Sequence, residues 1–258
     1  MCLIIFAHHA SAQYPFVLAA NRDEFYQRPS QQAALWSDSP NSQILAGKDL
    51  QAGGTWLGIT RNGRFAAVTN IRDPALTEQK TKSRGELTLN YLRGRQSPKQ
   101  YSESLIPNFD DYAGYNLLIG DRKVLYYVNN HEQKVSKLEP GVYGLSNGLL
   151  NSSWPKINKG RQTLQKILDS ELEPSIDLLL NMMYDQTPAA DADLPTTGLP
   201  QALERSLSSA FIHHPGRQYG TLCSTAIIVE HEGGLRFGEQ NFDESGLGTE
   251  CHFFQLGE

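Results

Sequence analysis

A cysteine directly after the initiator methionine is the residue whose type and place most clearly suggest chemistry. Cys2 is small enough for Met1 to be trimmed, and trimming would leave a thiol and a free α-amino group on one residue. Because the unperturbed pKa of an α-amino group is about 7.7 to 8.0, the amine can take the thiol proton directly or through a water. The chain end therefore predicts an N-terminal nucleophile, although a cysteine at this position is by itself more often buried or incidental.

Four polar residues, Asn21-Arg22-Asp23-Glu24, are expected to lie beside this cysteine. Apolar runs at Cys2–Ala7 and Pro15–Ala20 flank a small, polar connection and predict a hairpin. If the hairpin is centred near Ser11 or Ala12, Cys2 lies opposite about position 21, because paired residue numbers in an antiparallel ladder sum to a constant. Arg22 could then lower the thiol pKa, and Asp23 could anchor the terminal ammonium. Alone, the tetrapeptide could equally be a salt-bridged turn.

Two asparagines are the amide donors best placed to stabilise an oxyanion. Asn70 ends a second predicted hairpin, Thr55–Thr60 with Arg64–Asn70, joined at Asn62-Gly63 by a predicted type I′ turn. Asn147 follows the apolar run Val142–Ser146. Strand ends collect at one edge of a sheet, so we expect both amides near Cys2.

The remaining pattern alternates blocks of strands with blocks of helices. Two short helices are predicted between Ser83 and Pro107, with Ser83 and Ser97 as N-caps. Residues 186–200 are predicted to form a long loop. Strands are expected at Tyr115–Ile119, Val124–Val128, Val135–Leu138 and Val142–Ser146, as one meander, and at Thr221–Glu230, Leu235–Phe242 and His252–Leu256; helices are expected at Ser153–Leu168, Ser175–Tyr184 and Leu199–Phe211. Such segregated runs predict one α+β domain over residues 1–258 with antiparallel sheets.

Composition excludes several classes of protein. The net charge is −5 and no run of five or more basic residues occurs, so neither nucleic acid nor a membrane surface is an expected partner. The sequence contains no signal peptide or transmembrane pattern, and its three cysteines fit a reducing compartment, so a cytoplasmic protein is expected. Cys223 and Cys251 are predicted to be core residues. The histidine pairs at 8–9 and 213–214 lack metal-ligand spacing, so no metal site is predicted.

Several motifs together resemble the NRDE family, whose animal members are the transport and Golgi organisation proteins. They are MCLIIF, LAANRDEFYQRP, GGTWLG and VTNIRDP in residues 1–75, followed by SRGEL, GLSNG and YGTLCSTAIIV. The resemblance implies an N-terminal-nucleophile (Ntn) hydrolase-like fold, a four-layer αββα sandwich similar to choloylglycine hydrolases and penicillin V acylases. Carried over by motif, the implied catalytic residues are Cys2, Arg22, Asp23, Asn70 and Asn147. The later arginine of those enzymes has no match, since Arg217 lies upstream of the corresponding stretch.

Two functions of different class follow from the residues and the resemblance. The first is a cysteine amidohydrolase that cleaves a non-peptide C–N bond of a small-molecule amide and needs no cofactor. The second is a non-catalytic carrier of haem or of an acyl-CoA. The carrier would use the same cleft, with Asn21, Arg22, Asp23, Glu24, Arg72 and Arg84 as ligand-binding residues.

Overall fold

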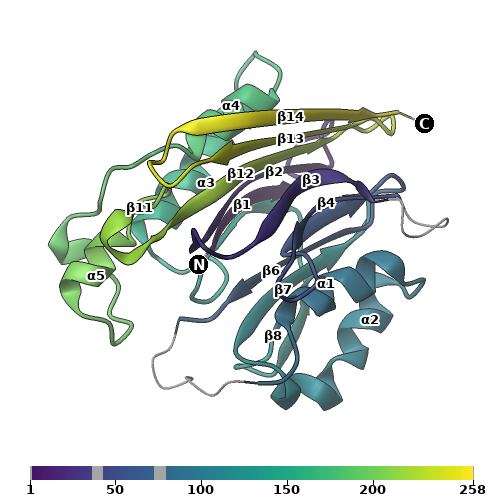
Figure 1. Ribbon diagram of the computed structural model, residues 1–258. Helices are drawn as coiled ribbons and strands as arrows, with labels where there is room; N and C mark the ends of the chain where they lie inside the picture. Colours follow the sequence, from purple (N-terminus) through teal and green to yellow (C-terminus); the bar gives the residue numbers. More distant parts are fainter. Residues whose placement is uncertain (1, 37–42, 73–79, 258) are drawn as a thin grey trace. The chain divides into compact units, whose positions relative to one another are not determined.

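The structure is a computed structural model that describes residues 2–36, 43–72 and 80–257. Met1 and the last two residues of VTNIRDP lie outside these ranges. The described chain forms two compact units: residues 2–27, 72 and 140–257 make the first, and residues 28–36, 43–71 and 80–139 make the second. Each unit contains its own antiparallel sheet with helices beside it (Figure 1). The predicted α+β class with antiparallel sheets is confirmed, and one domain over 1–258 stays a prediction.

The first unit is built around a sheet whose order is β10-β1-β2-β12-β13-β14, with the short β11 paired to β12. Its helices are α3 (Pro155–Leu168), α4 (Ile176–Met182) and α5 (Gln201–Ser206), with 3-10 turns η2 (Asp191–Asp193) and η3 (Pro215–Arg217). The strands are β1 (Cys2–His8), β2 (Phe16–Phe25), β10 (Gly141–Leu145), β11 (His213–His214), β12 (Tyr219–Val229), β13 (Leu235–Phe242) and β14 (Gly248–Leu256).

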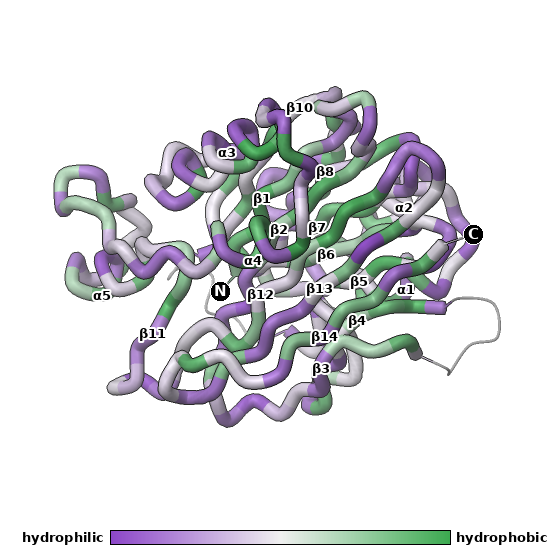
Figure 2. Tube along the Cα trace, turned by 90° about the horizontal axis from the view of Figure 1, so that it is seen from above, coloured by the Kyte–Doolittle hydropathy of each residue, from purple (hydrophilic) through white to green (hydrophobic). Residues whose placement is uncertain are grey.

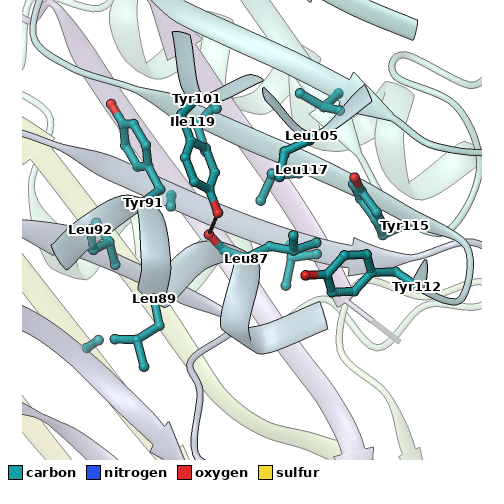
Figure 3. Close-up of a cluster of buried hydrophobic side chains, with 14 of the residues drawn as sticks. Leu87, Leu89, Tyr91, Leu92, Tyr101, Leu105, Tyr112, Tyr115, Leu117 and Ile119 are labelled. Carbon is teal, nitrogen blue, oxygen red and sulfur yellow. Dashed lines mark hydrogen bonds between the residues drawn. The ribbon is translucent and has the colours of Figure 1, made fainter. Parts of the chain in front are cut away.

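The second unit is a sheet in plain sequence order, from β3 to β9. Its strands are β3 (Ser30–Trp36), β4 (Ile44–Asp49), β5 (Leu57–Thr60), β6 (Phe65–Asn70), β7 (Tyr115–Gly120), β8 (Leu125–Asn129) and β9 (Lys134–Lys137), and its helical segments are α1 (Arg84–Arg93), α2 (Pro98–Ser104) and η1 (Ile106–Asp111). Leucines and tyrosines of the helices pack on the sheet (Figure 3), where the Tyr101 hydroxyl donates to the Leu87 carbonyl at 2.7 Å. Strands β3 and β4 were not predicted.

Side-chain caps set where most of the helices begin. The Ser83 hydroxyl accepts from the Gly85 N–H, Ser97 forms a capping box with Gln100, and Ser175 caps α4. The N-caps predicted at Ser83 and Ser97 are confirmed. Helix α3 begins at Pro155, with Trp154 in place of Ser153 at the cap. Figure 2 shows hydrophilic and hydrophobic residues alternating along α3, as expected of a helix with one buried face.

Four local predictions differ from the structure. Only Gly63 has a positive φ in the second hairpin, so the turn is a type I turn followed by a glycine bulge rather than type I′. The meander ends at β9, because β10 pairs with β1 in the first unit. Cys251 is exposed on β14, whereas Cys223 is buried as predicted. The last predicted helix is also shorter, since α5 covers only Gln201–Ser206.

The long loop 186–200 contains η2 and is held at several points. The Ala189 N–H donates to the Ser208 hydroxyl at 2.8 Å, and Arg205 forms an ion pair with Asp191. Over the described residues, no helix is both long and apolar enough to cross a bilayer.

Asn21 joins the sheet of the first unit to its helices. Its side chain is fully buried, and its Nδ2 donates to the carbonyls of Met183 and Ala210, both at 2.9 Å. Its Oδ1 accepts from the Ser224 hydroxyl on β12 at 2.6 Å. The first residue of the NRDE motif thus has a structural function, and ligand binding by Asn21 stays a prediction.

Replacing Asn21→Leu should therefore lower the free energy of unfolding by about 2 to 4 kcal/mol, because two buried carbonyls lose their donor. Urea unfolding followed by circular dichroism measures this value. The control is Asn181→Leu on the exposed side of α4, which should change stability by less than about 0.5 kcal/mol. Equal losses in both variants would contradict the structural function of Asn21.

Candidate functional site

The ladder between β1 and β2 places Cys2 beside the NRDE motif. Cys2 pairs with Arg22, as a hairpin centred on Ala12 predicts, and Arg22 in turn pairs with Cys223 on β12. On the other side of β1, Ile4 pairs with Leu145. The pairing ends there, and Asn147 lies two residues beyond the end of β10. Arg22 therefore lies opposite the predicted nucleophile on β2, and the segment that contains Asn147 follows β10, the strand on the other side of β1.

A bulge in β12 separates the site residues onto two faces of the sheet. Asp23 pairs with Thr221 and Arg22 pairs with Cys223, so Leu222 is the extra residue of the bulge. Directly paired side chains share a face. Cys2, Arg22 and Cys223 thus lie on one face, and Asp23 and Thr221 lie on the other. The second face is the helix-covered one, since Leu3 and Ala19 pack there against Ile157 of α3.

The segment after β10 holds Cys2 by its backbone. The Ser146 hydroxyl donates to the Cys2 carbonyl oxygen at 2.8 Å, and it also contacts the Asn147 Oδ1 at 3.3 Å. The Arg72 N–H donates to the Asn147 carbonyl at 2.7 Å. Ser146 and Asn147 are both fully buried. These bonds fix the Asn147 backbone and bring Arg72 into the first unit.

Asp23 is a carboxylate buried within the fold, with only 1% of its surface exposed. The Thr221 hydroxyl donates to Asp23 Oδ1 at 2.7 Å, and the Tyr219 hydroxyl donates to the Asp23 carbonyl oxygen at 2.9 Å. Burial raises the pKa of the Asp23 carboxyl, while the positive charges of Lys156 and Arg72 and the Thr221 hydrogen bond lower it. The ionised state of Asp23 therefore depends on nearby cations.

Burial also raises the pKa of the Cys2 thiol. The negative charge of Asp23 acts in the same direction, whereas the backbone N–H of Asp23 and the charge of Arg22 lower the pKa. A buried thiol of this kind needs a base close by to become a thiolate at neutral pH. The α-amino group that removal of Met1 would create on Cys2 is such a base.

A buried ion pair lies next to these residues. Arg72 Nη1 donates to Glu204 Oε2 at 2.6 Å, and the two side chains are 6% and 3% exposed. The Arg72 guanidinium also lies over the Trp154 ring, 4.8 Å from its centroid. Both the backbone N–H and the hydroxyl of Thr197 donate to the other carboxylate oxygen of Glu204. The loop 186–200 is thereby tied to the site through Glu204.

Four residues of this region were not predicted from the sequence as site residues: Lys156, Glu204, Thr221 and Tyr219. Lys156 is 5% exposed, and its Nζ donates to the Leu207 carbonyl at 2.9 Å. A lysine in the first turn of a helix, where the macrodipole disfavours positive charge, was a signal that could have identified it. Thr221 belongs to the matched YGTLCST stretch. Nothing in the sequence around Glu204 distinguishes it from a surface residue.

Other predicted residues are placed as follows. Asn70 ends β6 and Arg84 begins α1, so both belong to the second unit, where Arg84 donates to the Gly114 carbonyl. Glu24 is half-buried and accepts from the Phe25 N–H, and Arg217 is exposed in η3. The functions of these residues stay predictions. Within the ranges described, no three His, Cys, Asp or Glu side chains are grouped so as to bind a metal ion.

Comparisons with known proteins match this chain to one family. The family model for transport and Golgi organisation 2 matches residues 1–244. The human transport and Golgi organization protein 2 homolog is 33% identical over 96% of this chain and 95% of its own length. The Drosophila melanogaster protein is 27% identical over 93% and 92%. Among solved structures, a Caenorhabditis elegans N-acylethanolamine-hydrolyzing acid amidase ortholog superposes with a TM-score of 0.51 at 8% identity, covering 88% and 92% of the two chains. This likeness confirms the Ntn-hydrolase-like fold.

Removing the charge of Glu204 should be strongly destabilising. Glu204→Gln leaves Arg72 buried without its carboxylate, so the free energy of unfolding should fall by about 3 to 5 kcal/mol. Urea unfolding of the variant measures the loss. Glu103→Gln, which removes an exposed partner of Lys99, serves as the control and should cost less than about 1 kcal/mol. A Glu204→Gln protein as stable as the control would show that the ion pair contributes nothing.

Proposed function

This chain belongs to the transport and Golgi organisation 2 family, and from that premise we propose that it is a cysteine amidohydrolase whose nucleophile is Cys2. The substrate class is a small molecule with a non-peptide amide bond. The observation that carries the proposal is the register of β1, which puts Cys2 opposite Arg22, directly before Asp23 on β2, while the Ser146 hydroxyl next to Asn147 donates to the Cys2 carbonyl oxygen. Removal of Met1 would leave a free α-amino group on Cys2, and this amine is the base.

The reaction follows from these positions. The α-amine of Cys2 takes the thiol proton, and Sγ attacks the amide carbonyl carbon to form a tetrahedral oxyanion. The Nδ2 group of Asn147 donates to that oxyanion. The C–N bond then breaks as the ammonium returns its proton to the leaving nitrogen. Water gives a proton to the amine as it attacks the thioester carbonyl, the C–S bond breaks to release a carboxylic acid, and the ammonium returns its proton to the sulfur.

Asp23 and Arg22 have separate tasks on the two faces of the sheet. Asp23, buried and bonded to Thr221, anchors the ammonium form of the terminal amine on the helix-covered face. Arg22 shares the face of Cys2 and lowers the pKa of the thiol by its charge. Ser146 keeps the Cys2 carbonyl in place, so that the thiol and the amine keep a constant orientation.

The alternative, a carrier of haem or acyl-CoA, relies on arginines that bind acidic groups of the cargo. Arg72 is one of the three arginines, Arg22, Arg72 or Arg84, that this hypothesis offers for the acidic group. Its guanidinium is buried against Glu204 and Trp154. An acidic cargo would have to displace Glu204 to bind Arg72, so this contact disfavours Arg72 in that function.

A panel of N-acyl amides with a fluorogenic leaving group tests the proposal. Wild-type protein should release the fluorophore from at least one member, and Cys2→Ala should reduce turnover by about a thousandfold or more, because no acyl-enzyme can form. Cys223→Ala is the matched control, since this thiol lies in the same row beyond Arg22, and it should stay within about threefold of wild type.

Rapid quenching followed by peptide mass spectrometry should find the acyl group on Cys2. Wild-type protein that hydrolyses no amide, but binds haem or acyl-CoA equally well with and without Cys2, would contradict the proposal in favour of a carrier.

A further inference from the structure

The edge strands of the two sheets differ in how they are protected from pairing with another chain. The edges are β10 and β14 in the first unit and β3 and β9 in the second. Strand β9 is four residues long with a lysine at each end, and β3 has a register shift between Gln31 and Ala34. Strand β10 is five residues long, and Arg161 donates to the Val142 carbonyl within it at 3.1 Å. Short length, lysines, bulges and cover are the usual protections of a sheet edge.

Strand β14 lacks these protections along most of its nine residues. It pairs with β13 without a break from Cys251 to Leu256, and with no other strand in the part of the chain that the structure describes (Figure 1, yellow). It contains neither proline nor lysine, and Cys251 and Phe253 are exposed, Phe253 to 60%. Its outer row of backbone N–H and C=O groups is therefore open to a further strand.

The side chains of β14 alternate between the two faces of the sheet. Phe253 lies on the helix-covered face, because it pairs with Gly238, where a Cβ would meet the Ile176 side chain of α4 at 2.2 Å. Glu250 and His252 lie on the other face, and 3.5 Å separates the His252 Nε2 from the Glu250 Oε2. The strand thus presents one acidic and one basic side chain in a row along its edge.

This order of side chains is complementary to a second copy of β14. In a two-fold antiparallel pair one residue faces its own copy, and residues equally far on either side of it face each other. With Cys251 at the centre, Glu250 lies opposite His252 of the second copy, and the pair occurs twice. An imidazole donates a hydrogen bond to a carboxylate in its neutral and in its charged form. A centre at Glu250 or at His252 would instead bring two like side chains together, which is unfavourable.

We propose that β14 is the interface of a homodimer in which two copies of the strand pair antiparallel, with Cys251 facing its own copy. The sheets of the two first units then join into one sheet. The two-fold axis keeps the helix-covered faces on the same side, so Phe253 lies opposite Thr249 of the second copy and loses exposed apolar surface. The inference goes beyond the proposed function, because the interface uses no residue of the Cys2 site.

Light scattering during size-exclusion chromatography should give twice the mass of the chain. His252→Glu should raise the dissociation constant of the dimer about tenfold, because two pairs of like charges replace two favourable pairs. The double variant Glu250→His/His252→Glu exchanges the two side chains and should return the constant to within about threefold of wild type. Glu232→His, in the exposed turn between β12 and β13, is the control and should leave the constant unchanged.

Cys251 reports the register of the pair directly. Opposite Cα atoms of antiparallel strands lie about 4.5 or 5.5 Å apart, and a disulfide spans about 4.4 to 6.8 Å. Oxidation with copper phenanthroline, which takes one electron and one proton from each thiol, should therefore link two chains through Cys251. Thr249→Cys in a Cys251→Ser background is the matched control. Position 249 is exposed on the same face, but it lies about 14 Å from its own copy in this register, so no link should form.

Three results would overturn the inference. A single-chain mass at the highest soluble concentration would reject the dimer and would leave this edge to an extended segment of another protein. Linkage that is as efficient through position 249 as through Cys251, or that persists in Cys251→Ser, would reject the register. A dimer that His252→Glu does not weaken would reject the charge pairing. None of these measurements needs a substrate, so failure of the proposed amidohydrolase would not affect their outcome.

Discussion

The antiparallel register of β1 is the constraint on which the rest of the site depends. One ladder sets Cys2 opposite Arg22, and the other pairs Ile4 with Leu145, so that Ser146, just after β10, bonds to the Cys2 carbonyl oxygen. Because side chains alternate between faces, a slip of one residue would move the thiol to the helix-covered side and Asp23 to the other. The bonds from Asn21 to the carbonyls of Met183 and Ala210 oppose such a slip, since they require Asn21 to face the helices.

Buried charged side chains near Cys2 determine the electrostatics of the site. Burial raises the pKa of the Asp23 carboxyl, while the charges of Lys156 and Arg72 lower it, and Glu204 is a buried carboxylate bonded to Arg72. A bulge at Leu222 lets β12 present Thr221 to Asp23 and Cys223 to Arg22. Cys2, the proposed nucleophile, and Asp23, the proposed anchor of its amine, therefore lie on opposite faces of the sheet and belong to the two strands of one hairpin.

Much of this arrangement was predictable from local pattern. The hairpin, the proximity of Cys2 to the NRDE motif and the helix caps at Ser83 and Ser97 follow from short-range rules. The register, with Cys2 opposite Arg22, is the one that a hairpin centred on Ala12 gives, and Ala12 is one of the two predicted centres. Lys156 and Glu204 were not predicted because their partners lie far away in the sequence. Lys156 bonds to the Leu207 carbonyl, and Glu204 bonds to Arg72.

The central claim is that Cys2 becomes the amino terminus and supplies both nucleophile and base. The intact mass of the protein, purified without an N-terminal tag, tests it most directly. The account predicts a mass that lacks one methionine and an N-terminal peptide that begins with Cys2 carrying a free amine. A mass that includes Met1, or an acylated amine on Cys2, would contradict it, because the thiol would then have no base on its own residue.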